Sequence, residues 1–243
     1  MRDSSVPASF MSAAFMHVTT MASNSEIRYM PELAGPRMAT GFSMYLFCKR
    51  AMDLFVAGTM LICLAPVLAA VALMIKFTDG GTILFRQMRV GRGGREFPFY
   101  KFRSMVVNAE QLKARLAAQN HHHDPRTFKM KHDPRVTWIG RIIRKTSIDE
   151  LPQLWNVLIG DMTLVGPRPA VPSEVAKYNA HERYRLDVVP GLTCIWQVSG
   201  RADVDFSRQV EMDLEYICKR SLWFDFKLLC LTLPAVISGR GAY

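Results

Sequence analysis

An uncharged apolar stretch sets the strongest limit on how this chain can fold. From Leu54 to Ile75 no side chain carries a charge. About 20 apolar residues are enough to cross a bilayer as a helix, so a spanning helix is the first interpretation. Pro66 argues against it, because it lies in the middle of the stretch and removes a backbone donor. The helix should therefore kink or break at this proline.

Basic residues flank the apolar stretch on both sides. Lys49 and Arg50 precede it, and Lys76, Arg86 and Arg89 follow it. A spanning helix normally has its excess of Lys and Arg on one side only. Flanks of equal sign favour a re-entrant helix over residues 44–76, with both ends on the cytoplasmic face. On these grounds alone the spanning and the re-entrant alternatives both stay open.

Composition limits the kind of partner. The chain has 243 residues, of which 49% are hydrophobic and 21% charged, and its net charge is +10. Such a balance indicates a folded protein with an anionic partner: nucleic acid, acidic lipid or a phosphate-rich substrate. The five cysteines are dispersed and form no CxxC pair. They indicate neither a zinc site nor a disulfide framework.

Three zones follow from the pattern along the chain. Residues 1–43 lack a sustained apolar period, and we expect a disordered or weakly ordered tail. Residues 44–76 form the membrane-embedded helix, and residues 77–243 form a compact cytoplasmic domain with mixed helix and strand patterns. The expected fold class is α/β of the α+β kind. It is mostly helical, with a small β-hairpin or sheet and interfacial amphipathic helices.

A β-hairpin is expected directly after the apolar stretch. Thr82–Val90 and Arg95–Arg103 alternate in a strand-like way around the glycine-rich segment at 91–94. The second arm carries Lys101 and Arg103 among aromatic residues. One interpretation is a solvated strand face. The other is a cationic edge near the lipid headgroups, where both side chains meet a phosphate.

Several other segments receive simple predictions. Residues 108–119 have a helical pattern with Asn108 as N-cap, and the three consecutive histidines at 121–123 fit a solvated loop rather than a metal site. Ser221 can cap the final apolar helix. That helix either lies in the membrane interface with Trp223 at headgroup level or packs in the core of the domain.

Two adjacent carboxylates mark the centre of the domain. Ser147 and Glu150 match a capping box, with Ser147 as N-cap and Glu150 at the third helical position. A proline is tolerated without a large loss of stability only in the first turn of a helix, so Pro152 moves the expected start of the helix nearer Asp149. Either register leaves Asp149 in the first turn. There the helix dipole stabilises negative charge and free N–H groups can hold an anion.

A rigid turn with an arginine follows within the same unit. Gly160 ends the helix, 163–165 reads as a short buried strand, and Gly166-Pro167-Arg168-Pro169 locks a turn between two prolines. Alone, this turn is most often a surface feature. Beside the acid pair, the Arg168 guanidinium suits a phosphate oxygen pair. Mg²⁺ takes one or two carboxylates plus substrate phosphates, so the unit indicates a site for phosphates and a divalent cation.

These motifs resemble a known family. KTSIDELPQLWNVLIGDMTLVGPRP, QVSGR and the ending SLWFDFKLLCLTLPAVISGRGAY resemble the bacterial sugar transferases, the monotopic phosphoglycosyl transferases, from about Phe47 to Tyr243. The family's membrane segment is a helix-break-helix that dips into one leaflet, which here places the break at Ala65-Pro66. Ala65 stands where members often have Ser, and Cys194 where they commonly have Gly. The chain resembles the short, catalytic-core form.

The resemblance implies a reaction. Asp149 attacks the β-phosphate of a UDP-sugar, releases UMP and keeps the sugar phosphate, which undecaprenyl phosphate then takes. Asp149 and Glu150 hold Mg²⁺. Substrate and phosphate oxygens are held by a further set of residues: Lys101, Arg103, Arg144, Arg168, Gln197 and Arg201. The expected product is a hexose-1-phosphate on the lipid, at the cytoplasmic face of the bacterial inner membrane, as the first membrane step of exopolysaccharide assembly.

Two other classes of function stay in view. One is a membrane-tethered basic module that binds acidic lipid or phosphate without catalysis, and the other is a membrane phosphohydrolase that uses water as acceptor. Nucleic acid is not expected as a partner, because only FPFYKFR interleaves aromatic and basic residues. The sequence leaves open glucose or galactose as the sugar, a homo-oligomer, and downstream glycosyltransferases as partners.

Overall fold

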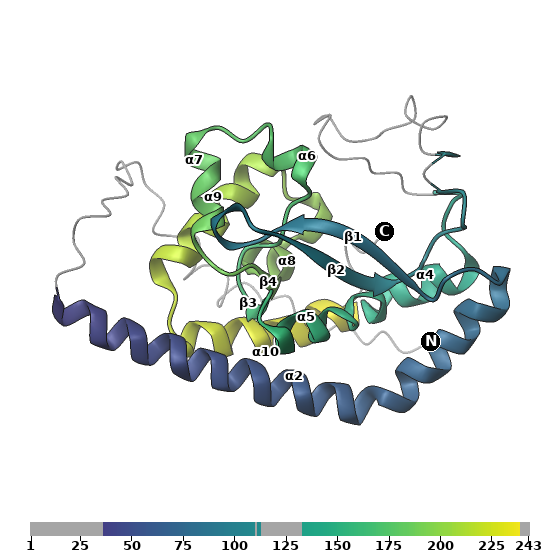
Figure 1. Cartoon of the computed structure of the whole chain (residues 1–243), viewed down its shortest axis with the longest axis horizontal. Coiled ribbons are helices and arrows are strands. Elements are labelled where there is room, and N and C mark those ends of the chain that lie inside the picture. Colours follow the sequence, from purple (N-terminus) through teal and green to yellow (C-terminus); the bar gives the residue numbers. More distant parts are fainter. Residues whose placement is uncertain (1–35, 110, 113–132, 239–243) are drawn as a thin grey trace, which may run out of the picture. The chain divides into compact units, whose positions relative to one another are not determined.

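The computed structural model describes residues 36–109, 111–112 and 133–238 (Figure 1). Two compact units make up the chain, residues 1–42 and 43–243, and every contact discussed below lies within the second. The expected histidine loop at 121–123 and most of the expected 108–119 helix lie outside the described residues. At the start of that helix, the N–H of Leu112 donates to the carbonyl of Asn108 at 3.2 Å.

The apolar stretch lies in one long helix, α2 (Pro36–Asp79). The helix continues through Pro66, and Figure 1 shows its axis changing direction in the second half, as expected of an internal proline. Its segment Ser43–Asp79 is, among the described residues, the one helix long and apolar enough to cross a membrane, and most of its apolar window is exposed. The prediction of an apolar N-terminal helix is confirmed, while its re-entry into one leaflet stays a prediction.

The basic residues before the apolar stretch are tied to the domain. Arg50 donates to the carbonyls of Val157 at 2.6 Å and Leu158 at 2.8 Å, which lie in the last turn of a helix. Asp53 is 2% exposed and accepts from the Thr163 hydroxyl at 2.6 Å. One face of α2 is therefore polar and committed to internal partners.

The expected hairpin is confirmed. Strands β1 (Leu84–Val90) and β2 (Glu96–Phe102) pair antiparallel, and the connection contains the 3₁₀ turn η2 (Arg92–Gly94). In this register Phe85 faces Lys101 and Arg89 faces Phe97. Phe97 and Phe99 on the same face are buried in the main core.

The segment that carries the acid pair follows residues 113–132, which lie outside the described part of the chain. Helix α4 (Trp138–Lys145) is capped by Thr137, whose hydroxyl accepts from the Gly140 N–H. The 3₁₀ turn η4 (Ile148–Glu150) leads into α5 (Gln153–Ile159), which ends at Gly160 with φ 93°. Gly160 ends the helix as expected, because a left-handed residue there satisfies carbonyls of the last turn.

A second, parallel pair of strands comes next. Strand β3 (Thr163–Val165), which the sequence predicted, pairs with β4 (Gly191–Thr193). The remaining elements are α6 (Pro172–Val175), α7 (Ala180–Arg183), η5 (Tyr184–Asp187), α8 (Ile195–Ser199), η6 (Arg201–Asp203), α9 (Phe206–Lys219) and α10 (Leu222–Ser238). The domain is mostly helical with two small sheets, as expected.

The main core joins these elements around β3. Its buried side chains come from α2, β2, α5, β3 and the C-terminal helices, and include Ala57, Phe99, Leu154, Leu164 and Leu228. Burial of such apolar side chains is the main stabilising contribution. Because α2 contributes to this core, the apolar helix is part of the folded domain.

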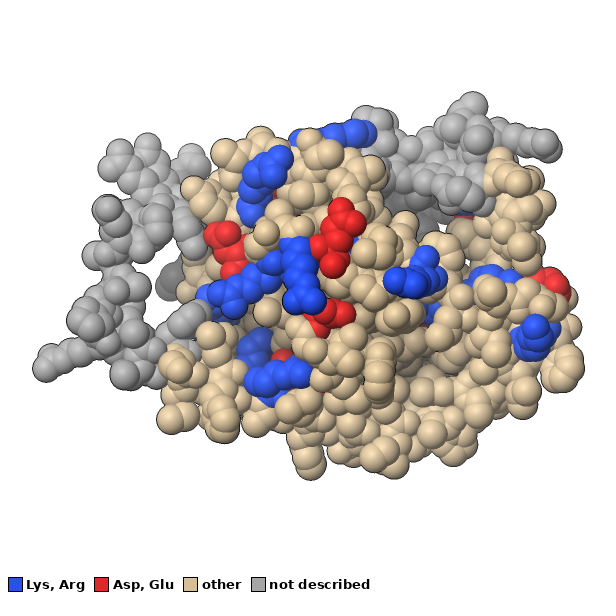
Figure 2. Space-filling view, in the orientation of Figure 1, with Lys and Arg blue, Asp and Glu red and all other residues tan. Residues whose placement is uncertain are grey.

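The final helix is buried on one side and exposed on the other, while its place at a membrane interface stays a prediction. The Ser221 hydroxyl accepts from the Phe224 N–H at 3.2 Å, which confirms the cap. Leu228 packs in the core, whereas Trp223 is 74% exposed. Exposed large apolar side chains also lie on α2, α4 and α5, and Figure 2 shows an uncharged lower edge where α2 lies in Figure 1.

Two glycines allow a close backbone approach beside the Pro-Arg-Pro segment. The N–H of Gly191 donates to the Pro167 carbonyl at 2.8 Å. A Cβ on Gly191 would lie 2.0 Å from the Gly166 nitrogen, which no rotamer change can relieve because the obstacle is backbone. Gly191 therefore brings β4 against the start of the Pro-Arg-Pro segment.

We expect Gly191→Ala to lower the free energy of unfolding by about 3 kcal/mol or more, because the added methyl overpacks a backbone contact. Thermal melting in detergent measures the loss. Gly58→Ala is the matched control, since a Cβ at Gly58 meets nothing within 4 Å. Equal melting temperatures for the two variants would contradict the prediction.

Candidate active site

The acid pair lies in a tight turn, not in an α-helical first turn. Ser147 has φ 56°, a left-handed conformation that is uncommon outside glycine, and its side chain makes no capping hydrogen bond. An N-cap needs extended backbone, so the predicted capping box of Ser147 and Glu150 is wrong. Asp149 instead lies in the 3₁₀ turn η4, ahead of α5.

Asp149 is buried and unpaired. Its residue surface is 8% exposed, and no hydrogen bond or ion pair holds its carboxylate within the described residues. Burial and then the charge of Glu150 raise the pKa of Asp149 to about 7. Lys101, Arg144 and Arg168 act in the opposite direction. The expected stabilisation by a helix dipole is thus outweighed by the loss of water.

Glu150 is paired with the predicted arginine. An Arg168 guanidinium nitrogen lies 2.5 Å from Glu150 Oε1, and both side chains are about a quarter exposed. Burial alone would raise the pKa of Glu150, but the ion pair outweighs it and holds that pKa below its ordinary value. The two acids therefore differ: Glu150 is ionised and paired with Arg168, while the Asp149 carboxylate has no partner among the described residues.

The segment that carries Arg168 is fixed along its backbone. The Gly166 N–H donates to the Thr193 carbonyl at 2.9 Å, and the Pro169 carbonyl accepts from Arg89 at 2.8 Å. The Ala170 carbonyl accepts from the Val90 N–H at 2.9 Å. With two prolines fixing φ, these bonds confirm a preorganised turn and hold the guanidinium in place.

Lys101 and Arg144 lie close enough to act on Asp149. Burial lowers the pKa of Lys101 to about 8, against the attraction of Asp149. The Lys101 ammonium also lies 5.2 Å from the centre of the Phe85 ring. Arg144, near the end of α4, makes no side-chain hydrogen bond or ion pair among the described residues. Both cations are available to an anion.

Arg89 is a site residue that the sequence analysis treated only as a membrane flank. Its guanidinium lies 5.0 Å from the Phe99 ring centre, and burial followed by Arg168 lowers its pKa to about 10. Its Nε is buried without a partner in the described part of the chain. The register of the hairpin could have identified Arg89 as a site residue. It pairs Arg89 with Phe97, which puts Arg89 on the same face of the sheet as Lys101.

The structure gives the other predicted site residues different positions. Arg103 is paired with Asp79 at the end of α2. Gln197 accepts from the Cys194 thiol at 3.1 Å, so the unusual cysteine is a hydrogen-bond donor. Arg201 has φ 52°, and burial lowers its pKa against the opposing charge of Glu150. The acid pair is therefore joined by Lys101, Arg144, Arg168 and Arg201, but Arg103 is engaged elsewhere.

Gln153 is a second residue that the sequence analysis missed. It begins α5, is fully buried, and has no hydrogen-bond partner for either amide atom among the described residues. A buried amide without partners costs on the order of 1–3 kcal/mol. Unmet polar groups of this kind are retained where function needs them, and this one shares a short segment with Asp149.

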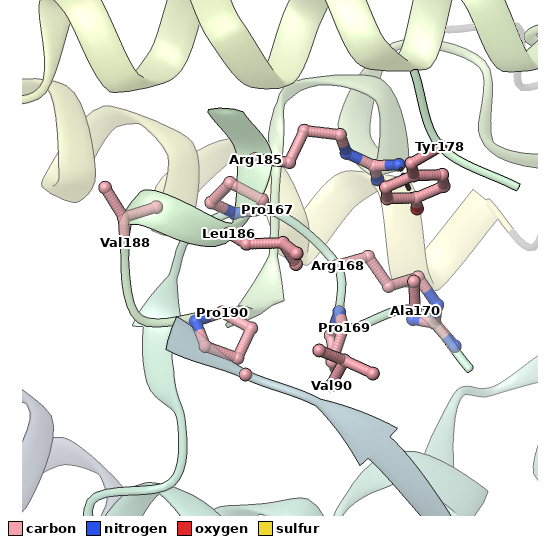
Figure 3. A pocket seen from close by; sticks show the side chains of 11 residues that line it. Val90, Pro167, Arg168, Pro169, Ala170, Tyr178, Arg185, Leu186, Val188 and Pro190 are labelled. Carbon is pink, nitrogen blue, oxygen red and sulfur yellow. Dashed lines mark hydrogen bonds between the residues drawn. The ribbon is translucent and has the colours of Figure 1, made fainter. Parts of the chain in front are cut away.

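A small hollow lies beside the arginine segment (Figure 3). Arg168 lies along its wall with Pro167 and Pro190, while Arg185 reaches to Tyr178 on another side. Arg185 is committed to Asp213 at 2.7 Å and to the Tyr178 hydroxyl at 2.8 Å. Neither carboxylate of the acid pair lines the hollow. The hollow therefore borders the Arg168 segment but not Asp149 or Glu150.

The arrangement suits phosphate chemistry. A free carboxylate surrounded by cations can attack phosphorus or bind a divalent cation while the cations hold phosphate oxygens. No cluster of three His, Cys, Asp or Glu ligands occurs among the described residues. Asp149 and Glu150 fit Mg²⁺ nonetheless, because this ion needs only one or two carboxylates plus phosphates, and Asp149 lacks any other partner.

Comparison with known proteins gives a consistent result. The family model described as bacterial sugar transferase matches residues 44–239. A galactosyl transferase, CpsE, of Streptococcus agalactiae serotype III is 48% identical over 200 residues, covering 82% of this chain and 44% of the relative.

Two further relatives are named for the reaction itself. An undecaprenyl-phosphate galactose phosphotransferase of Salmonella typhimurium is 45% identical, over 81% of this chain and 42% of its own. An undecaprenyl-phosphate glucose phosphotransferase of Komagataeibacter xylinus is 44% identical, over 80% of this chain and 37% of its own. This chain thus spans less than half the length of these relatives, and their names differ in the sugar.

Asp149→Asn should stabilise the metal-free protein at alkaline pH. Because the folded pKa of Asp149 is raised to about 7, its contribution to stability is complete below its unfolded pKa and is lost as pH rises through 7. Asparagine does not titrate. The variant should gain on the order of a few kcal/mol over the wild type between about pH 4 and pH 8.

Unfolding monitored by tryptophan fluorescence at several pH values in EDTA measures this gain. Glu150→Gln should shift the transition to lower pH, since the charge of Glu150 raises the pKa of Asp149. A constant difference between the wild type and Asp149→Asn from pH 5 to pH 8 would refute the assignment.

Proposed function

The chain belongs to the bacterial sugar transferase family, and on that basis we propose that it transfers a hexose-1-phosphate from a UDP-sugar to undecaprenyl phosphate, releasing UMP. Glucose and galactose are the candidate sugars, in the first membrane step of exopolysaccharide assembly. The observation that carries the proposal is Asp149, a buried carboxylate that lies among cations and has no hydrogen-bond or ion-pair partner in the described part of the chain.

The first half-reaction forms a bond between Asp149 and phosphorus. A carboxylate oxygen attacks the β-phosphorus of the UDP-sugar, and the bond from that phosphorus to the bridging oxygen breaks. UMP leaves with the bridging oxygen and the electron pair. An acyl phosphate that carries the sugar remains on Asp149.

The second half-reaction restores the enzyme. A phosphate oxygen of undecaprenyl phosphate attacks the same phosphorus, and the bond to Asp149 breaks. The carboxylate is regenerated, and the lipid diphosphate sugar leaves. Since the acceptor reacts only after UMP has formed, the kinetics are ping-pong.

The cations supply most of the transition-state stabilisation. Phosphoryl transfer needs little covalent chemistry beyond positioning and charge neutralisation. Lys101 and Arg144, which surround Asp149, hold oxygens of the transferred phosphate. Arg168, a bidentate donor in a fixed turn, holds a second phosphate oxygen pair, while Glu150 orients it. Arg201 and Gln197 bind more distant parts of the substrate.

Magnesium would be held by Asp149 and Glu150 with substrate phosphates. When bound, it neutralises phosphate charge. The orientation of Arg168 by Glu150 needs no metal, because their ion pair is already formed.

The apolar surface supports a lipid acceptor. Exposed apolar side chains on α2, α5 and α10, among them Phe55, Trp155 and Trp223, belong to the same unit as the acid pair. A protein that lies in one leaflet of the inner membrane can bind a soluble nucleotide and a lipid phosphate at one site. The bend of α2 fits a re-entrant segment with both ends on the cytoplasmic face.

Release of UMP from purified, detergent-solubilised protein tests the proposal. With UDP-galactose or UDP-glucose, Mg²⁺ and no lipid, the wild type should release UMP roughly equal to the enzyme present. Asp149→Asn should release none. Arg168→Ala should slow release about tenfold to hundredfold, because a charge-assisted phosphate contact contributes about 1.5–3 kcal/mol.

Arg208→Ala is the matched control, because among the described residues the Arg208 side chain pairs with Glu211 alone, on the surface of α9. Release that begins only when undecaprenyl phosphate is added would contradict the covalent step. Continuous turnover without lipid would identify a phosphohydrolase, and no release from any UDP-sugar would favour a non-catalytic binding module.

Cysteine labelling tests the topology. In a background without the five native cysteines, Met44→Cys and Thr82→Cys place exposed thiols on either side of the apolar segment. If the segment re-enters, a membrane-impermeant thiol reagent added to intact cells should label neither position. Both should react after the cells are opened. Labelling of one position alone in intact cells would establish a spanning helix.

A further inference from the structure

Lys49 of α2 is part of a buried polar network. It is 8% exposed, and its ammonium group donates to Asp225 Oδ2 at 2.9 Å, to the Val165 carbonyl at 2.9 Å and to the Tyr216 hydroxyl at 3.3 Å. These three acceptors match the three donors of an ammonium group. The Tyr216 hydroxyl lies 2.6 Å from Asp225 Oδ1, so the aspartate is satisfied as well.

The network holds the strand that leads to the catalytic arginine. Val165 ends β3 and is followed directly by Gly166-Pro167-Arg168. One turn further along α2, Asp53 accepts from the Leu164 N–H at 2.9 Å and from the Thr163 hydroxyl. All three residues of β3 are therefore hydrogen-bonded to side chains of α2: Thr163 and Leu164 donate to Asp53, and Val165 accepts from Lys49.

A charge in this position has a purpose other than stability. Burying an ion pair costs desolvation, and apolar replacements are often at least as stable. A basic flank of a membrane segment would be expected to face lipid headgroups, but Lys49 points inward to a backbone carbonyl. Together with the Tyr216 hydroxyl, which lies 2.8 Å from the same carbonyl oxygen, the ammonium group fixes the position of that carbonyl.

We propose that Lys49 is a positioning residue: through the Val165 carbonyl it sets the position of Arg168 relative to the acid pair, so that the membrane helix is part of the active-site framework. The inference rests on the proposed function. We expect a shift of the Val165 carbonyl to move Arg168 as well. Gly166 and Pro167, which lie between them, are hydrogen-bonded to β4, so the backbone has little freedom to absorb the shift. Displacement of a binding group by about 1 Å can cost about a hundredfold in rate.

The test is a double-mutant cycle with Arg168, using steady-state UMP release by the full-length protein with UDP-galactose or UDP-glucose and undecaprenyl phosphate as acceptor. Lys49→Met should lower kcat/KM about tenfold to hundredfold, and Lys49→Arg should restore most of it. In an Arg168→Ala background, Lys49→Met should cost less than about threefold, because the group it positions is absent.

Lys76→Met is the matched control, since Lys76 lies at the other end of α2 and the one hydrogen bond of its side chain to the described residues is to the exposed Gly80 carbonyl. It should retain wild-type kcat/KM. Equal losses for Lys49→Met and Lys76→Met would mean that a flanking charge, not positioning, matters, and would overturn the inference. An equal factor for Lys49→Met with and without Arg168 would also overturn it.

Loss of Lys49 alone leaves Asp225 buried without its counter-ion, which can prevent folding. Lys49→Met with Asp225→Asn removes both charges, and the same cycle is run on this pair. If Asp149→Asn remains active or the wild type releases no UMP, the proposed function fails and the inference with it. If Asp149→Asn is inactive but the cycle is additive, the positioning role alone is wrong.

Discussion

A lysine buried against a backbone carbonyl links the apolar helix α2 to the turn that carries Arg168. Lys49 lies between Asp225 of α10 and Val165 of β3, and Asp53 holds the same strand one turn along. Around this strand the main core gathers side chains from α2, α5 and the C-terminal helices. An apolar helix that only anchored the protein would not need polar residues facing inward. The anchor and the site therefore form one folded unit.

The site separates the roles of two neighbouring acids through their surroundings. Glu150 has a guanidinium partner and remains ionised, whereas Asp149 is buried without one and its pKa rises to about 7. A proton is thus held weakly near neutral pH on the carboxylate that we propose as the nucleophile. The left-handed turn at Ser147 puts Asp149 in this position, and backbone strain of this kind is retained where a site needs it.

Local patterns predicted most elements because their causes are local. The Thr82–Arg103 hairpin, the end of α5 at Gly160, the strand at 163–165 and the cap by Ser221 each depend on a few neighbouring residues. The prediction of a capping box at Ser147 was wrong because a residue with left-handed backbone cannot serve as an N-cap. The residue types around Ser147 give no sign of this backbone conformation. Arg89 was missed because its role depends on the register between two strands.

The sequence by itself determined the apolar helix, the acid pair, the proline-fixed arginine and the resemblance to a family, because these are contiguous patterns of residue type. Only the tertiary structure decided which charges meet. It paired Arg168 with Glu150, engaged Arg103 with Asp79, added Arg89 to the site and turned Lys49 inward. The physical reason is that an ion pair depends on distance and burial, and both are set by segments that lie far apart in the chain.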